Sequence, residues 1–202
     1  MLYLASQSPR RQQLLTQIGV RFALLAPDPA EDAEALEARQ GRESPQRYVQ
    51  RVTGLKLDAA LLRLRARGLP AGPVLCADTT VALGRDILGK PADAAQAAEM
   101  LAQLSGRTHR VLTAVALQSG RRRWAALSVS QVEVAPLTRA QIRQYVASGE
   151  PMGKAGAYAI QGLAAMWVAR IRGSHSGIVG LPLHETADLL RQAGVPLGET
   201  LA

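Results

Sequence analysis

Short apolar segments typical of strands alternate along this chain with segments that begin at a helix cap, and this alternation restricts the fold more than any other feature. Ser8-Pro9 and Ser44-Pro45 each place a capping serine before a proline at the first helical position. Two neighbouring apolar segments, 111–118 and 124–134, are typical of an antiparallel pair. The pattern predicts a mixed α/β fold, with residues 1–202 in one domain. The other expected strands are 2–5, 20–25, 74–83, 87–88 and 164–171, and the expected helices are 9–18, 45–67, 93–104, 138–147 and 182–193. In the helix 45–67 the apolar residues that recur at helical spacing, and so predict its inner face, are Val49, Val52, Leu55, Ala59 and Leu62. Loops are expected at 28–37, which is acidic, and at 173–177.

The basic residues are numerous but scattered. A net charge of +8 and a pI near 10.5 invite a nucleic-acid hypothesis. Aromatic residues, which would supply a stacking platform for bases, make up only 3% of the chain. The basic run Arg121-Arg122-Arg123 lies between two expected strands, and we interpret it as a solvated hairpin tip. We therefore expect no nucleic-acid partner.

The chain carries no pattern typical of export or membrane insertion. No apolar run approaches the ~20 residues that a bilayer-spanning helix needs, and the N-terminus has no basic lead. The one cysteine, Cys76, lies in an apolar run, where we expect a buried small side chain and not a nucleophile. A cytoplasmic protein without a membrane partner is the expectation.

Only three of the 24 Lys and Arg residues are lysines: Lys56, Lys90 and Lys154. Because the chain uses guanidinium wherever a positive charge is enough, the few ammonium groups are candidates for roles that need a compact point charge. Lys90 and Lys154 lie in segments rich in Gly and Pro, which are typical of loops. The alternative is that three surface lysines survived by chance.

Ser6 to Arg11 follow one expected strand and open the first expected helix. Backbone N–H groups at the helix start, the Ser6 hydroxyl and the guanidiniums of Arg10 and Arg11 would then point to one place. That combination favours the binding of phosphate oxygens. Any strand-to-helix turn shares part of this character, so other segments must support the assignment.

Asp78 places a carboxylate inside the apolar strand 74–83. Burial of an unpaired carboxylate is costly, so the residue is expected at a cavity, where it ligates a divalent metal or activates water. The alternative is a strand-end Asp that hydrogen-bonds to the following turn.

The segment Gly84 to Lys90 has the glycine and lysine spacing of a P-loop, but we reject that match. Pro91 stands where a P-loop needs Ser or Thr, and Ile87-Leu88 is typical of strand. Lys90 is still a candidate phosphate ligand in a different architecture.

In the glycine-rich stretch 149–162, Lys154 and Gln161 lie among small residues that allow a ligand to approach closely. The three histidines show no metal-ligand spacing with cysteine and no triad arrangement. We expect structural roles for His109, His175 and His184.

Five segments resemble, in order and spacing, the motifs of the Maf family of nucleoside triphosphate pyrophosphatases: LASQSPRRQQLL, ADTTVALGRDILGKP, LSGRTHRVLTAVAL, GEPMGKAGAYAIQG and GLPLHETADLL. The resemblance runs from Leu2 to about Leu190. It implies an elongated mixed α/β sheet with flanking helices, similar to inosine triphosphate pyrophosphatases, with the site in a cleft between two lobes. It also implies a homodimer that uses a divalent metal, Mg²⁺ or Mn²⁺, to hydrolyse a nucleoside triphosphate to the monophosphate and pyrophosphate.

Within the family, the ADT and KAGAYAIQG segments resemble the branch that acts on dTTP and UTP. The resemblance implies catalytic roles for Asp78, Lys56 and Lys90, and a metal site at Glu31 and Asp78. The residues that it implies for substrate binding are Ser6, Arg10, Arg11, Lys154 and Gln161.

Three positions depart from the family pattern. Gly153 stands where the family usually has Asp, and His175 and Gly177 stand where it usually has Tyr and Asn. These departures bear on rate and specificity more than on the class of reaction. The alternative function, from another class, is a non-catalytic nucleotide-binding regulator of cell division.

Overall fold

The structure is a computed structural model that describes residues 1–28, 31 and 35–198. Within these residues, seven strands form one mixed sheet in the order β2-β1-β3-β5-β6-β7, and β4 pairs with β3 beside that path. The strands are β1 (Leu2–Leu4), β2 (Phe22–Leu24), β3 (Val74–Leu83), β4 (Asp86–Leu88), β5 (Thr108–Ser119), β6 (Arg122–Val134) and β7 (Val168–Arg172). The α-helices are α1 (Pro9–Gln17), α2 (Pro45–Ala66), α3 (Ala94–Leu104), α4 (Arg139–Ala147), α5 (His175–Val179) and α6 (Leu183–Gln192), and the 3-10 helices are η1 (Ala35–Glu37), η2 (Ala155–Ala157) and η3 (Leu163–Trp167).

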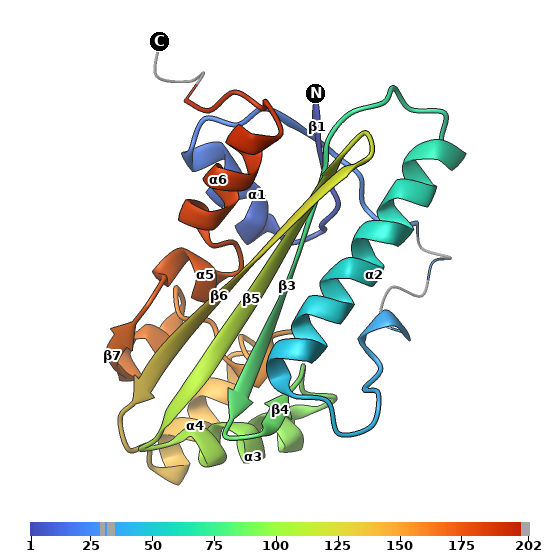
Figure 1. Ribbon diagram of the computed structural model, residues 1–202. Helices are drawn as coiled ribbons and strands as arrows, with labels where there is room; N and C mark the ends of the chain where they lie inside the picture. Colours follow the sequence, from blue (N-terminus) through green and yellow to red (C-terminus); the bar gives the residue numbers. More distant parts are fainter. Residues whose placement is uncertain (29–30, 32–34, 199–202) are drawn as a thin grey trace.

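The sheet is mixed because β1 runs parallel to both β2 and β3, whereas β3, β5, β6 and β7 are antiparallel neighbours. The longest pair is the β5–β6 hairpin, which crosses the molecule in Figure 1. Arg121 lies in the turn of this hairpin, as expected for the basic run. The predicted mixed α/β class is confirmed.

Helix α2 covers one face of the sheet (Figure 1). Its buried side chains, such as Val52 and Leu57, pack against alternate residues of β3 and β5. Cys76 lies under this helix and is 1% exposed, so the prediction of a buried cysteine is confirmed. Burial raises the pKa of its thiol to about 11.

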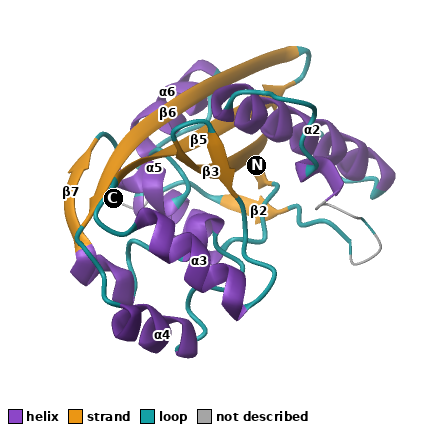
Figure 2. Cartoon of the chain, turned by 90° about the horizontal axis from the view of Figure 1, so that it is seen from below, coloured by secondary structure: helices purple, strands orange, loops and turns teal. Residues whose placement is uncertain are grey.

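The opposite face carries two separate apolar clusters. Leu75 and Ala77 of β3 belong to a cluster with α1 and α6, whereas Val81 belongs to a cluster with α3 and α4. Figure 2 shows α3 and α4 together at one end of the molecule. Thr79 lies between the two clusters on this face, because side chains alternate along a strand.

The middle of β3 has a free edge. On the side away from β5, β1 pairs with β3 at Val74 and Leu75, and β4 pairs with it from Val81 onward. Among the described residues, no strand pairs with β3 on that side between 76 and 80. Side chains from both faces of the strand can therefore reach one space at this edge.

Most helix boundaries agree with the sequence, because caps mark them. The Ser44 and Asp93 side chains accept hydrogen bonds from backbone N–H groups in the first turns of α2 and α3, and Thr138 and Gln141 form a capping box on α4. Ser8 precedes α1 as expected, but its side chain makes no capping bond.

Three sequence predictions about local structure are wrong. Leu62, predicted on the inner face of α2, is 64% exposed, because the buried stripe passes through Leu57 and Leu64 instead. The predicted strand 164–171 begins as the 3-10 helix η3, and the predicted loop 173–177 contains the start of helix α5. Within the described part of the chain, no helix is both long enough and apolar enough to cross a membrane.

Candidate functional site

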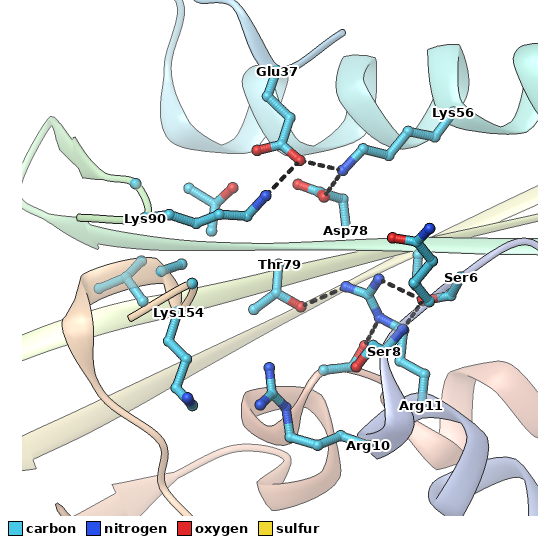
Figure 3. A pocket seen from close by; sticks show the side chains of 18 of the residues that line it. Ser6, Ser8, Arg10, Arg11, Glu37, Lys56, Asp78, Thr79, Lys90 and Lys154 are labelled. Atoms are coloured by element: carbon cyan, nitrogen blue, oxygen red, sulfur yellow. Dashed lines mark hydrogen bonds and ion pairs between the residues drawn. The ribbon is translucent and has the colours of Figure 1, made fainter. Parts of the chain in front are cut away.

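All the residues predicted for the site line one cavity of about 700 Å³ at the free edge of β3. Asp78 and Thr79, which point to opposite faces of the strand, both contribute to its wall. Figure 3 shows Asp78 beside Lys56, Glu37 and Lys90, and Thr79 on the side of Arg11. One side of the strand thus presents the carboxylates Asp78 and Glu37 to the cavity, and the other side presents Arg10 and Arg11. Its predicted members are Ser6, Arg10, Arg11, Glu31, Lys56, Asp78, Lys90, Lys154 and Gln161.

Lys56 lies between two carboxylates on the side of β3 that faces α2. Its Nζ donates to Asp78 Oδ1 at 2.5 Å and to Glu37 Oε1 at 2.7 Å. Burial of the Lys56 ammonium favours its neutral form, but the two carboxylates outweigh that effect and raise its pKa. The same Glu37 oxygen also lies 3.4 Å from the Nζ of Lys90.

Glu37 had no role in the sequence prediction. Burial favours the protonated form of its carboxyl, but the charges of Lys56 and Lys90 outweigh this and lower its pKa. Its position is fixed by η1 and by Tyr48, whose hydroxyl donates to the Glu37 carbonyl oxygen at 2.9 Å. The sequence feature that could have indicated a role for Glu37 is its place in the acidic segment 28–37, seven residues before the Ser44 cap.

Glu31 lies at the wall of the same cavity but is held by an arginine. Arg63 Nε donates to Glu31 Oε1 at 2.7 Å and its Nη2 donates to the other carboxylate oxygen, while its Nη1 donates to the Leu25 carbonyl oxygen. These bonds lower the pKa of Glu31 to about 2. Its assignment as a metal ligand stays a prediction.

The start of α1 supplies the cationic side of the cavity. Arg11 is held by protein acceptors: its Nε donates to the Gly180 carbonyl oxygen at 2.8 Å, and its Nη1 donates to Ser6 Oγ at 3.3 Å. The side chain of Arg10 is half-buried beside it, and burial together with the positive charge of Arg11 lowers its pKa. No carboxylate in the described part of the chain forms an ion pair with Arg10 or Arg11, so these mutually repelling cations favour an anionic ligand.

Lys154 directly precedes a tight turn that packs on β3. Gly156 has φ +69°, and a Cβ built there would lie 2.8 Å from Val81 Cγ1. The Gly156 N–H donates to the Gly89 carbonyl oxygen at 3.0 Å, which ties this turn to the segment that carries Lys90. The Lys154 ammonium donates to the carbonyl oxygen of Glu150, and burial with the charge of Arg10 lowers its pKa.

Two carboxylates, Asp78 and Glu37, lie near each other, because both accept from the Lys56 ammonium, and these two could hold a divalent cation. Within the described residues, no group of three or more His, Cys, Asp or Glu side chains is placed to hold a metal ion. Mg²⁺ is commonly bound through one or two carboxylates, with substrate phosphates completing the shell, so an open pair of hard oxygen ligands fits such a cation.

His109 is the buried histidine of the three. It is 1% exposed, and its Nε2 lies 2.8 Å from the hydroxyl of Tyr158, which lines the cavity. Burial lowers its pKa to about 4, so the ring is neutral. Its burial agrees with the structural role expected for it, whereas His175 and His184 are exposed.

Several known proteins are similar to this chain in sequence. A family model described as Maf-like protein matches residues 1–193. A dTTP/UTP pyrophosphatase of Polaromonas sp. is 68% identical to this chain and covers 97% of each chain, and one of Albidiferax ferrireducens is 62% identical and covers 96% of each. A solved nucleoside-triphosphatase / dITP/XTP pyrophosphatase from Mycobacterium abscessus is similar at a TM-score of 0.44 and 19% identity, over 67% of this chain and 75% of that one, a likeness too partial to carry an argument. Since the family model spans nearly the whole sequence, the chain belongs to the family of Maf-like proteins.

Proposed function

We propose that this protein hydrolyses dTTP and UTP to the monophosphate and pyrophosphate. The observation that carries the proposal is the cavity at the free edge of β3, which is lined by three carboxylates and six cationic side chains: Glu31, Glu37 and Asp78, and Arg10, Arg11, Lys56, Arg63, Lys90 and Lys154. Relatives that share 62–68% of the sequence are dTTP/UTP pyrophosphatases, which supports these two nucleotides as substrates.

The cationic side chains hold the triphosphate. A nucleoside triphosphate carries about four negative charges at neutral pH, spread over oxygens that accept charge-assisted hydrogen bonds. Arg10 and Arg11 bind phosphate oxygens from one side of β3, and Lys90 binds them from the other. Lys154 and Gln161 complete the wall toward the α-phosphate or the base.

A divalent cation, Mg²⁺ or Mn²⁺, would be held by Asp78 and Glu37 together with phosphate oxygens. When bound, it supplies positive charge to the phosphates and makes water more acidic. Glu31 could bind the cation only if its carboxylate gave up its hydrogen bonds to Arg63. The fit rests on the hard oxygen ligands of Asp78 and Glu37.

Asp78 accepts the proton of the attacking water, and Lys56 holds the Asp78 carboxylate in place through the 2.5 Å contact between them. In-line attack at the α-phosphorus drives electrons toward the leaving pyrophosphate. The fixed cations around the cavity stabilise that developing charge without reorganisation.

The substitution Asp78→Asn tests this assignment by removing the base while keeping the shape of the side chain. Pyrophosphate release from dTTP and UTP with Mg²⁺ or Mn²⁺ is expected to fall at least ~100-fold. Asp86→Asn, at an exposed residue of β4, is the control and is expected to keep the rate. Near-normal turnover in Asp78→Asn would refute the role.

The same assay separates the two classes of function. Wild-type protein that binds the nucleotides but releases no pyrophosphate from any of them would favour a non-catalytic regulator. The homodimer, the cytoplasmic location, the single domain and the lack of nucleic-acid and membrane partners stay predictions, and sedimentation of the purified protein tests the first.

A further inference from the structure

Two buried or half-buried threonines connect Arg11 to helix α5 by hydrogen bonds whose direction can be worked out. Thr113 Oγ1 lies 2.7 Å from the Gly177 carbonyl oxygen, and a carbonyl can only accept, so the Thr113 hydroxyl donates to it. Thr113 and Thr79 lie 3.0 Å apart through their hydroxyls. Because the proton of Thr113 is already used, Thr79 must donate to Thr113. The oxygen of Thr79 therefore presents a lone pair toward Arg11, whose Nη2 lies 3.4 Å away.

Arg11 has a second acceptor that depends on the same threonine. Its Nε donates to the carbonyl oxygen of Gly180, the residue that ends helix α5. Thr113 of β5 contacts the same helix, because its hydroxyl donates to the carbonyl oxygen of Gly177. Thr113, which is 1% exposed, thus fixes both Thr79 and the α5 turn, and each of these supplies one acceptor to Arg11.

These contacts give the Arg11 guanidinium a defined orientation and leave some of its N–H donors unused. An arginine has five N–H donors, of which Gly180, Ser6 and Thr79 accept from three. One N–H on each terminal nitrogen remains, at the wall of the cavity. A guanidinium fixed before the ligand arrives loses less rotamer freedom on binding. Arg10, in contrast, has no hydrogen-bond partner for its guanidinium among the described residues.

We infer that Thr113 and Thr79 are positioning residues that orient the Arg11 guanidinium toward a polyphosphate. The location supports a polar function for these hydroxyls, because they form a polar layer on the sheet face between two apolar clusters. The inference rests on the proposed function for the identity of the natural ligand, but its test does not require turnover.

The test is a double-mutant cycle on the binding of inorganic tripolyphosphate, measured by titration calorimetry. Thr113→Val keeps the shape of the side chain and removes the hydroxyl, and we expect affinity to fall about tenfold, because Thr79 and the α5 turn lose the contact that fixes them and Arg11 in turn loses its fixed acceptors. Thr113→Ser restores the hydroxyl and is expected to bind within about twofold of wild type. In an Arg11→Ala background, Thr113→Val is expected to change affinity less than about twofold, since the group it orients is gone.

Thr186→Val is the matched control. Thr186 is a fully buried threonine of α6 whose hydroxyl has no partner in the described part of the chain, and it does not line the cavity. The same substitution there is expected to leave tripolyphosphate affinity unchanged. If Thr113→Val does not fold, as judged by its circular dichroism and melting temperature, Thr79→Val enters the same cycle.

Equal losses of affinity with and without Arg11, or wild-type affinity in a folded Thr113→Val or Thr79→Val protein, would overturn the inference. A wild-type protein that binds tripolyphosphate but releases no pyrophosphate from any nucleotide would instead overturn the proposed function. The two failures are therefore distinguishable.

Discussion

One oxygen of Glu37 accepts contacts from two lysines that belong to different parts of the chain. Lys56 comes from α2 and Lys90 from the loop after β4, and both ammonium groups approach Oε1. Without a ligand, this carboxylate neutralises part of the positive charge that would otherwise be available to phosphate. With a cation bound, the same carboxylate is a ligand for it.

These two roles give Glu37→Gln effects of opposite sign. Loss of the charge is expected to tighten metal-free binding of tripolyphosphate about fivefold, because Lys56 and Lys90 lose a competing anion. Metal-dependent pyrophosphate release is expected to fall at least ~10-fold, because the cation loses a ligand. Calorimetry and a pyrophosphate assay measure the two quantities. Glu99→Gln, at an exposed position of α3, should change neither. Weaker tripolyphosphate binding in Glu37→Gln would argue against the first role, and unchanged pyrophosphate release would argue against the second.

At this scale, sequence reasoning found the cavity and missed one of its carboxylates. The three lysines stand out in an arginine-rich chain, and Asp78 stands out in an apolar strand. These unusual residue types identified side chains that lie together in the structure. Glu37 does not depart from its surroundings, since the acidic loop 28–37 offers several carboxylates at similar spacing. Which of them reaches Lys56 depends on the path of the loop, and side-chain types do not encode that path. Residues 29–30 and 32–34 of this loop lie outside the described residues.

Among the elements, the turn at η2 is held by a backbone hydrogen bond and by close packing against the side chain of Val81. Gly156 allows the chain to pass within van der Waals distance of Val81, and the adjacent Ala157 also has a positive φ of 58°. The turn therefore fixes Lys154 relative to Lys90 through the bond between Gly156 and Gly89.

Gly156→Ala is expected to destabilise the protein through two costs. A left-handed backbone costs alanine about 1–2 kcal/mol, and the added methyl group meets Val81 at a distance that forces a shift costing about 1–3 kcal/mol more. Gly84→Ala is the matched control, because φ is +62° and the space is open, so only the first cost applies. Urea unfolding measures both free energies, and equal losses in the two variants would contradict the contact with Val81.

Elements were predictable where a cap or an unbroken apolar run marks them. The boundaries of β3 and α4 follow from such local signals. The predictions for 164–171 and 173–177 failed because both segments are short, and long-range contacts decide their conformation. Ser130 of β6 bonds to Ser174 just before α5, and that partner is 44 residues away in the sequence.

For the whole molecule, His109 couples protonation to unfolding. Its folded-state pKa of about 4 lies below the ordinary value, so between about pH 6.5 and pH 4 the unfolded chain binds a proton that the folded chain does not. Stability therefore falls as the pH falls through this window.

The expected loss between pH 7 and pH 5 is about 2 kcal/mol in the free energy of unfolding. His109→Phe removes the titrating group, so its free energy of unfolding should change less over the same range, even though the variant starts from a lower stability. Urea denaturation at the two pH values measures the difference. His184→Phe, at an exposed position, should keep the wild-type dependence. Identical slopes in all three proteins would assign the acid sensitivity to other groups.

The burial of Cys76 has a practical consequence. The chain has a single sulfhydryl, and with a pKa of about 11 beneath α2 it is neither accessible nor ionised near neutrality. This thiol should therefore resist maleimide, iodoacetamide and mild peroxide. A cysteine introduced on the outer surface would be the one position that takes a fluorophore or spin label, without prior removal of the natural one.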